Sequence, residues 1–185
     1  MSPEAGASHR GPGAPGGGPA GALKRSFPPI VDDRARVLML GTLPGEESLR
    51  RGEYYAHPRN LFWPILFALF EAAPIADYRA RTDFVRAQQI ALWDVVAAGE
   101  RTASADAAIR REVPNAIPAL LDTYPRIAAV AFNGGGARRL HDRHFGRDPR
   151  LAYLALPSTS PAYARLDFAQ KLARWQALRE ALAEL

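Results

Sequence analysis

The sequence predicts an α/β fold, specifically a three-layer α/β/α sandwich with a central four-stranded parallel sheet. Four short apolar runs have the length of strands and are bounded by turn or breaker residues, and helical stretches lie between them. Near-continuous apolar runs suit strands that are covered on both faces, as in a parallel sheet. Because strands and helices alternate, the helices are expected to form layers on both faces of that sheet.

The individual elements follow from these runs and from the residues that interrupt them. The expected strands are 37–40, 90–93, 127–132 and 151–156. The expected helices are 60–70, 78–88, 117–122, 137–145 and 167–185. Pro64 must lie near the first turn of its helix, because proline lacks the amide donor that later turns require. The last helix is the most distinct, since apolar residues recur from Phe168 to Leu185 at steps of three and four and Asp167 can cap its start.

Length and composition indicate one folded domain with an N-terminal tail. The chain has 185 residues, of which 48% are hydrophobic and 23% are charged, and this is enough apolar material for a full core. Eleven of residues 1–21 are Gly or Pro, and no large apolar side chain follows Met1 in this segment. We therefore expect residues 1–21 to be a disordered Gly/Pro-rich tail and residues 22–185 to be a single domain.

The charge of the chain is compatible with a phosphate-rich partner. The formal net charge is +5, and 22 of the 24 basic residues are arginine, since Lys24 and Lys171 are the only lysines. Arginine can bind phosphate oxygens in pairs through its planar guanidinium group. A GC-rich genome, which favours arginine codons, would explain the same composition equally well.

The residues that the chain lacks narrow the possible classes of protein. It has no cysteine, which excludes disulfides, thiolate zinc sites, cysteine-held iron–sulfur clusters and a cysteine nucleophile. The longest apolar run, 61–70, has ten residues, whereas a membrane-spanning helix needs about 20. No carboxylate-rich motif accompanies His141 and His144 in the sequence, so they are not expected to bind a metal ion. We expect a cytoplasmic monomer, nucleoid-associated in a bacterium, without membrane association, metal or cofactor.

The first two polar segments follow the first expected strand. Ligands of open parallel sheets bind beyond the carboxyl ends of the strands, so these segments are candidates for a site. Residues 41–49, GTLPGEESL, contain glycines that permit a tight turn and the close approach of a ligand, although an ordinary turn would also explain them. Residues 54–63, YYAHPRNLFW, combine aromatic, imidazole, guanidinium and amide groups. We expect Phe62 and Trp63 in the core, and Tyr55 and Asn60 at the cleft.

Two further polar segments follow the third and fourth expected strands. Asn133 is followed by three glycines, which bare backbone N–H groups at a helix N-terminus, although a plain strand-to-helix turn explains them equally well. Residues 156–163, LPSTSPAY, place three hydroxyl side chains between two prolines in a stiff loop. Serine and threonine hydroxyls commonly contact phosphate, so this loop is a candidate for binding nucleic acid.

Taken together and in this order, these motifs resemble the uracil-DNA glycosylase superfamily, and most closely its hypoxanthine (deoxyinosine) branch, often called family 6. The resemblance is carried by GTLPGEESL with YYAHPRNLFWPIL, by ALWDVV, and by FNGGGA with LPSTSPAYA. It covers roughly residues 26–175, and the YYAHPRN-x-FW and LPSTSPA strings are its specific parts. It implies a four-stranded parallel sheet between helices, in agreement with the alternation of the apolar runs.

Two departures from the superfamily pattern bear on the expected chemistry. Most members place Asp or Asn at the third position of the first motif, where this chain has Leu43. In the hypoxanthine branch the Asn of HPRN takes the catalytic role, and the resemblance assigns that role to Asn60. The second motif of uracil-specific members begins with histidine, where this chain has Leu156, which disfavours efficient excision of uracil.

The resemblance also implies roles for the other loop residues. Tyr55 would stack on the extruded base, and Asn133 would read the edge of that base. The pocket would be lined through backbone groups by Gly41, Thr42 and Leu43. Contacts with DNA are expected from Ser158, Thr159, Ser160, Pro161, Ala162, Tyr163, His57 and Arg59. Within this set, residues 158–160 would grip phosphates, and residues 161–163 would lie where a wedge fills the gap in the duplex.

The implied activity is hydrolysis of the N-glycosidic bond of deaminated bases, chiefly hypoxanthine, in double- or single-stranded DNA, leaving an abasic site. One alternative is a uracil- or mismatch-preferring enzyme of the same superfamily. Another is a module that binds damaged DNA without cutting it, which Leu43 favours. A third is an enzyme that binds a nucleotide phosphate at residues 134–136, although the sequence has no nucleotide-binding fingerprint.

Overall fold

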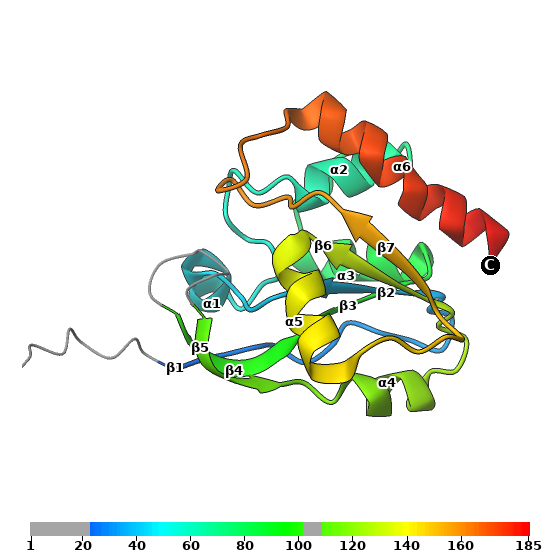
Figure 1. The fold of residues 1–185 in the computed structure, drawn as a ribbon. Coiled ribbons are helices and arrows are strands. Elements are labelled where there is room, and N and C mark those ends of the chain that lie inside the picture. The colour runs from blue at the N-terminus through cyan, green and yellow to red at the C-terminus, as the bar shows by residue number, and fades with distance from the viewer. Residues whose placement is uncertain (1–22, 102–108) are drawn as a thin grey trace, which may run out of the picture.

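The core of the molecule is a parallel sheet of four strands, as the sequence predicts. The computed structural model describes residues 23–101 and 109–185, and the tail predicted for residues 1–21 lies outside them. The strands are β2 (Val37–Gly41), β3 (Ile90–Asp94), β6 (Ala129–Asn133) and β7 (Ala152–Leu156). They pair in the order β3-β2-β6-β7, and all three pairings are parallel (Figure 1).

Helices cover both faces of this sheet, which confirms the three-layer α/β/α arrangement (Figure 1). One layer contains α2 (Phe62–Leu69), α3 (Tyr78–Ala87) and α6 (Phe168–Glu184). The other contains α4 (Ile117–Thr123) and α5 (Gly135–Phe145). The five predicted helices are confirmed with small shifts at their ends. The predicted cap of the last helix is also present, because the Asp167 carboxylate accepts from the Gln170 N–H at 2.8 Å.

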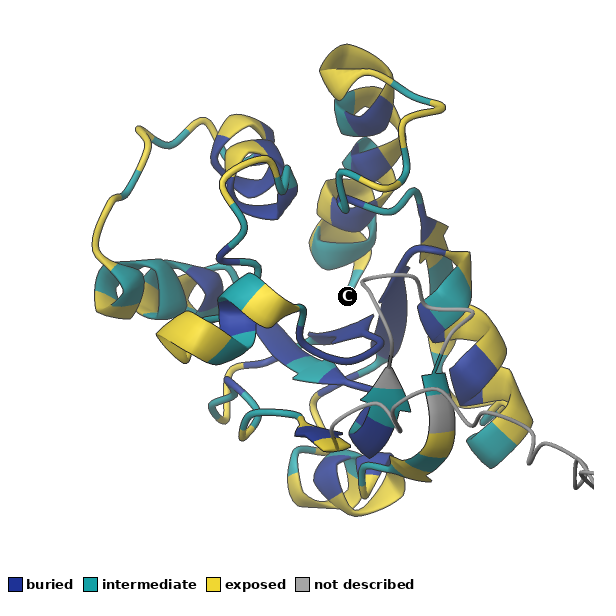
Figure 2. Cartoon of the chain, turned by 90° about the vertical axis from the view of Figure 1, so that its left-hand side faces the viewer, coloured by how far each residue is buried: buried dark blue, intermediate teal, exposed yellow. Residues whose placement is uncertain are grey.

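Successive residues of each strand point to opposite layers, so the sheet divides the core into two clusters. Met39 packs towards the cluster that holds Phe62 and Trp175. Its neighbour Leu40 packs towards the cluster that holds Leu140. The strands at the centre are buried, and the helices expose their outer sides (Figure 2). Apolar residues are therefore required along β2, β3 and β6, which are buried over nearly their whole length, and this explains their continuous runs in the sequence.

A second, antiparallel sheet was not predicted. It consists of β1 (Leu23–Arg25), β4 (Val96–Arg101) and β5 (Ile109–Pro114), in the order β1-β4-β5. The sequences of β4 and β5, VAAGER and IRREVP, mix apolar with charged residues, so neither strand is apolar over its whole length. The pairing of β4 with β5 also contains register shifts, and Arg111 has a φ of 49°. Irregular, charged strands of this kind give no periodic signal.

The short helix α1 (Glu46–Arg51) was also missed, although it forms part of the candidate site. Six residues are too few to show the 3.6-residue period. Its signals are electrostatic, since Glu46 and Glu47 occupy the first turn and Arg50 and Arg51 the last. The helix ends at Gly52, whose left-handed φ of 68° is a conformation that glycine adopts at little cost.

We predict that replacing Trp175 with alanine destabilises the protein by about 3–5 kcal/mol, the usual cost of truncating a large buried aromatic side chain. Trp175 is fully buried against Phe62, and its Nε1–H donates to the Pro157 carbonyl at 3.0 Å. Chemical denaturation monitored by circular dichroism measures the loss. Phe168→Ala is the control, because Phe168 on the same helix is 39% exposed. A loss of less than about 1 kcal/mol for Trp175→Ala would contradict the packing described here.

Candidate active site

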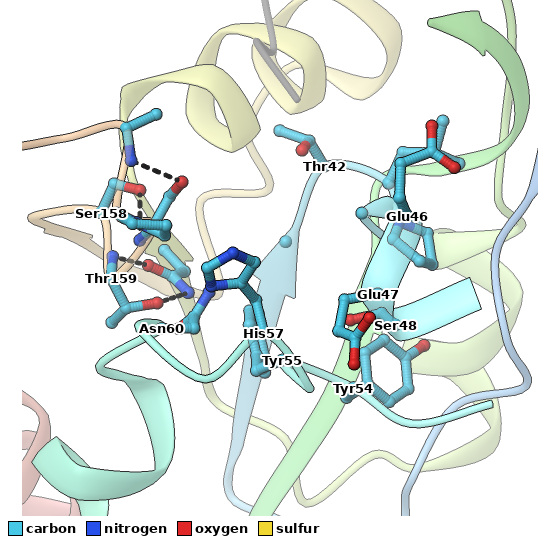
Figure 3. Close-up of a pocket in the computed structure, with 18 of the residues that line it drawn as sticks. Thr42, Glu46, Glu47, Ser48, Tyr54, Tyr55, His57, Asn60, Ser158 and Thr159 are labelled. Carbon is cyan, nitrogen blue, oxygen red and sulfur yellow. Dashed lines mark hydrogen bonds between the residues drawn. The ribbon is translucent and has the colours of Figure 1, made fainter. Parts of the chain in front are cut away.

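A cavity of about 570 Å³ opens at the carboxyl edge of the parallel sheet. It lies within the size range of small-molecule sites, about 300–1,000 Å³. Three segments form its walls, namely the loop from β2 into α1, the segment that leads into α2, and the loop that follows β7 (Figure 3). Every site residue predicted from the sequence lines this cavity except Tyr163. The structure therefore gathers into one place the loops that the sequence singled out separately.

Thr159 joins two of these walls and the end of β6 through three hydrogen bonds. Its backbone N–H donates to Asn133 Oδ1 at 2.9 Å, and its Oγ1 accepts from Asn133 Nδ2 at 2.9 Å. Its carbonyl accepts from the Leu61 N–H at 3.0 Å. The side chain of Thr159 is fully buried. Thr159 thus fixes the loop after β7 against both β6 and the segment that carries Asn60, and its predicted contact with phosphate stays a prediction.

Asn133 lines the cavity and also braces it. Its amide uses one acceptor site and one donor hydrogen on Thr159, and the residue is only 8% exposed. An amide has two N–H donors and two lone pairs, so it retains the capacity for a further contact with a ligand. The predicted role of Asn133 in reading a base edge stays a prediction, and the structure adds the bond to Thr159.

Tyr55 presents an aromatic ring in the cavity and adopts a strained backbone conformation. Its φ is 56°, in the left-handed region that residues other than glycine rarely adopt. The ring stacks on Phe62, with centroids 3.8 Å apart and planes at 19°. Phe62 and Trp63 are buried core residues, as predicted. Strain held in place by a rigid aromatic support is typical of functional positions, and a ring on such a support can stack on a planar ligand.

Asn60 is held in a fixed orientation just before α2. Its Oδ1 accepts from the Phe62 N–H at 3.0 Å, and its backbone N–H donates to the His57 carbonyl at 2.8 Å. In the close-up Asn60 lies beside Ser158 and Thr159, while Glu46 and Glu47 lie on the other side of the view (Figure 3). The amide is therefore preorganised at the wall of the cavity, which is what orienting a water molecule requires.

The floor of the cavity contains a carboxylate that the sequence analysis did not single out. Gly41 and Asp94 are opposite each other at the ends of β2 and β3. Asp94 is 4% exposed, and its Oδ2 accepts from Ser26 Oγ at 3.0 Å. A Cβ on Gly41 would stand 2.5 Å from Asp94 Oδ1 and 3.1 Å from the Tyr55 hydroxyl. The available signals were the acidic residue that ends the apolar run IALWD and its place in the ALWDVV motif of the resemblance.

The acidic residues of α1 at the rim are already committed to ion pairs. Glu47 binds Arg50 and Arg51, and these hydrogen bonds lower the pKa of Glu47 to about 2. Glu46 contacts Lys24 of β1. A carboxylate with so low a pKa is a poor proton acceptor at neutral pH.

Burial raises the pKa of the neighbouring Tyr54, so its hydroxyl stays neutral and donates to the Phe27 carbonyl at 3.3 Å.

The remaining predicted DNA contacts lie at or near the mouth of the cavity. Arg59 and Ala162 are exposed, and the Arg59 N–H donates to His57 Nδ1 at 3.1 Å. The loop after β7 is stiffened from within, since Ser158 Oγ accepts from the Ser160 N–H at 3.2 Å. Tyr163 lies outside the cavity, where its carbonyl accepts from Lys171 Nζ at 2.9 Å.

The part of the chain that the structure describes contains no group of three or more His, Asp or Glu residues placed to hold a metal ion. Within the same residues, no helix is long and apolar enough to cross a membrane.

Comparison with known proteins identifies the family of this fold and site. The model of the uracil DNA glycosylase superfamily matches residues 28–181. The chain belongs to the uracil DNA glycosylase superfamily. The matched residues include all four strands of the parallel sheet and all the segments that form the cavity, so the resemblance seen in the sequence motifs is confirmed.

Two curated proteins and one solved structure are similar to the chain. A protein named hypoxanthine DNA glycosylase from Methanosarcina acetivorans is 32% identical over 159 residues, which are 84% of this chain and 98% of that protein. One of the same name from Methanosarcina barkeri is 38% identical over 112 residues, 60% of this chain and 71% of that protein. The solution NMR structure of a candidate uracil DNA glycosylase from M. acetivorans superposes with a TM-score of 0.74 at 30% identity, covering 88% of this chain and 99% of that one.

This superfamily member has Leu43 where the common first motif has Asp or Asn, and the structure shows where that residue lies. Leu43 lines the cavity, but only 5% of it is exposed, and its alkyl side chain cannot orient water. Among the cavity residues, Asn60 offers a fixed amide on the wall formed by the segment before α2. The shift of the catalytic role that the resemblance implies is thus compatible with the geometry.

We predict that Gly41→Ala lowers the rate of base excision about 100-fold while the fold survives. The new Cβ would displace the Asp94 carboxylate or the Tyr55 hydroxyl, and a misplacement of about 1 Å in a site can cost that much. Single-turnover excision and thermal melting measure the two effects. Gly45→Ala is the matched control, because nothing lies within 4 Å of its Cβ position and its φ is −75°. Equal rates for the two variants would contradict the close contact over Gly41.

Proposed function

We propose that the protein is a DNA repair glycosylase that hydrolyses the N-glycosidic bond of deaminated bases in DNA, chiefly hypoxanthine, and leaves an abasic site. The observation that carries this proposal is the single cavity in which an aromatic ring, a fixed amide and a rigid hydroxyl-rich loop meet. The names of the two curated relatives, which match over more than two thirds of their own lengths, support hypoxanthine as the base.

The proposed reaction requires the target nucleotide to leave the duplex. A base inside the stack cannot reach an enclosed site, and its extrusion costs a few kcal/mol, least when it is poorly paired. Deamination of adenine opposite thymine leaves a hypoxanthine–thymine mismatch, which pairs less well than adenine–thymine, and this favours the selection of hypoxanthine. Stacking on Tyr55, which Phe62 supports from behind, offsets part of the cost of unstacking.

Asn60 is proposed to act by positioning rather than by proton transfer. An amide has no titratable nitrogen at neutral pH, so it cannot serve as a general base. Its Oδ1 has two lone pairs, of which the Phe62 N–H uses one, and the other can hold water or face the developing positive charge on the sugar. Glu47 is a poor alternative base, because its oxygens accept from Arg50 and Arg51 and these hydrogen bonds lower its pKa to about 2.

Two alternative functions would give different results in an assay for abasic sites. A uracil- or mismatch-preferring glycosylase would cut uracil faster than hypoxanthine in matched duplexes. A module that only binds damaged DNA would bind such duplexes without producing abasic sites. A gel assay for abasic sites on duplexes with hypoxanthine, uracil, xanthine or ethenoadenine separates all three. We expect hypoxanthine to be cut fastest, and the absence of abasic sites on every duplex would refute the proposal.

We predict that Asn60→Ala slows single-turnover excision by about 10²–10³-fold, the typical effect of losing one well-placed electrostatic group. The fold should survive, since the change removes one hydrogen bond to the Phe62 N–H, worth about 1 kcal/mol. Glu47→Ala is the control at the same cavity, and it should retain a near-normal rate. If Asn60→Ala keeps the rate and Glu47→Ala loses it, the catalytic group is the carboxylate of α1.

We also predict that binding to any duplex weakens steeply between low and physiological salt, because basic side chains release counterions from the phosphates. The net charge of +5 favours several such contacts. Arg59→Gln should lower the slope of log affinity against log salt by about 1, the effect of losing one phosphate contact. Arg126→Gln, an exposed position at the opposite edge of the sheet, should leave the slope unchanged. Identical slopes for both variants would show that Arg59 does not touch phosphate.

A further inference from the structure

We propose that Lys171 is a positioning residue for the extrusion of the target base, because its buried ammonium group holds residues 160–163 in one conformation. The inference rests on the proposed function, and it adds a residue that lies outside the motifs that carry the resemblance. Lys171 belongs to α6 and does not line the cavity. Its effect on the reaction is therefore indirect, through the loop after β7.

Lys171 is a buried cation whose hydrogen bond and aromatic contact both involve one residue. It is 2% exposed, and burial lowers the pKa of its ammonium group. Its Nζ donates to the Tyr163 carbonyl at 2.9 Å and lies 5.3 Å from the centre of the Tyr163 ring, which is within the range of a cation–π contact. Within residues 23–101 and 109–185, no carboxylate forms an ion pair with Lys171.

The burial of Lys171 makes its contact with Tyr163 costly to break. An ammonium group that loses its partners in the interior is destabilised far more than an exposed one, so other conformations of Tyr163 are disfavoured. An apolar side chain in the same place would pack without this penalty and would leave the loop free to move. Because replacing a buried charge by an apolar group is often neutral or stabilising, the stability of the core does not explain a lysine here.

The loop after β7 leads directly into α6 and is fixed to that helix at both of its ends (Figure 1). Trp175 lies one turn beyond Lys171 on the same face of α6, and its Nε1–H donates to the Pro157 carbonyl at 3.0 Å. Lys171 holds Tyr163 at the other end of the loop, and Thr159 between them is bound to the end of β6. The part of the loop beyond Thr159 is therefore fixed by Lys171.

Residues 160–163 form a turn whose last residue is the one that Lys171 binds. The Tyr163 N–H donates to the Ser160 carbonyl at 3.0 Å, and the Ala162 N–H donates to Ser160 Oγ at 3.3 Å. Pro161 and Ala162, the two middle residues of the turn, line the cavity, and Ala162 is exposed. By holding the end of the turn, Lys171 fixes these two residues relative to the cavity.

A fixed turn in this place assists the extrusion of a base from a duplex. A base that leaves the stack opens a gap, and a protein segment that fills the gap must hold its place against the neighbouring bases. A preordered turn enters the gap without a further loss of conformational entropy, whereas a mobile turn loses that entropy on binding. A single strand has no paired stack that closes again behind the base. The contact made by Lys171 should therefore matter for duplex DNA and not for single-stranded DNA.

The test compares Lys171→Met with wild-type protein on deoxyinosine in a duplex and in a single strand of the same sequence. Rates are measured in a single turnover at saturating protein, so that differences in affinity do not contribute. Methionine is unbranched and apolar, and it removes both the donor and the charge. We expect the variant to cut the duplex about 10–100-fold more slowly, the scale of losing one hydrogen bond from a charged group, and the single strand within about 2-fold of wild type.

Extrusion is also measured without cleavage. In a duplex that carries 2-aminopurine next to 2′-fluorinated deoxyinosine, which resists cleavage, the fluorescence of 2-aminopurine rises when the neighbouring base leaves the stack. Saturating Lys171→Met should give a smaller rise than saturating wild-type protein. If wild-type protein does not cut the single strand, this fluorescence decides.

Controls separate the inference from a loss of fold and from the proposed function. Arg174→Met removes a positive charge from an exposed position of the same helix and should leave the ratio of the two rates and the fluorescence unchanged. If Lys171→Met does not fold by circular dichroism, Lys171→Gln decides, because its amide is uncharged and its side chain is one atom shorter. A folded variant that keeps either the wild-type ratio of duplex to single-strand rates or the full rise in fluorescence overturns the role of Lys171 alone. Wild-type protein that cuts neither substrate overturns the proposed function together with this inference.

Discussion

The site depends most on the hydrogen bonds that Thr159 makes with Asn133 and Leu61. The loop after β7 has no regular secondary structure, so its backbone groups need partners to hold one conformation. Thr159 supplies them, because its N–H and hydroxyl bind the Asn133 side chain and its carbonyl binds the Leu61 N–H. These bonds place the hydroxyl-rich loop and the Asn60 amide on adjoining walls of one cavity. Both walls are thereby fixed relative to the end of β6.

The parallel sheet makes this arrangement possible, since all four strands end at the same edge. The pairing of β2 with β3 puts Gly41 beside Asp94, and the missing side chain of Gly41 leaves room for the Asp94 carboxylate and the Tyr55 hydroxyl, which both lie close to where its Cβ would stand. Tyr55 retains a left-handed backbone conformation to reach this place. The strained backbone of Tyr55 and the close packing over Gly41 thus lie where the proposed chemistry occurs, at the edge of the buried parallel sheet.

The sequence predicted the parts of the molecule that obey a regular period. Apolar runs gave the four parallel strands, and three- and four-residue spacing gave α6, because burial on both faces or on one stripe leaves a clear pattern. The strands β4 and β5 were missed since their charged, bulged sequences have no such pattern. Motif resemblance found Tyr55 and Asn60, but the mutual bonding of Asn133 and Thr159 joins residues 26 positions apart and is visible only in three dimensions. Asp94 lies in the ALWDVV motif that supports the resemblance, but it was missed because no role was assigned to its carboxylate.

The central claim is that this cavity receives a base extruded from DNA, and the most direct test maps a trapped complex. A duplex with 2′-fluorinated deoxyinosine resists cleavage, because fluorine destabilises the developing sugar cation, and can be followed by amide chemical shifts. We predict the largest changes at Gly41, at Tyr55 and in the loop 158–162, in excess of those caused by an undamaged duplex. No comparable change should occur around the smaller cavity of about 300 Å³ between α4, the end of α5 and β7, at the opposite edge of the sheet. Equal changes with damaged and undamaged DNA at the residues of the larger cavity would contradict the account.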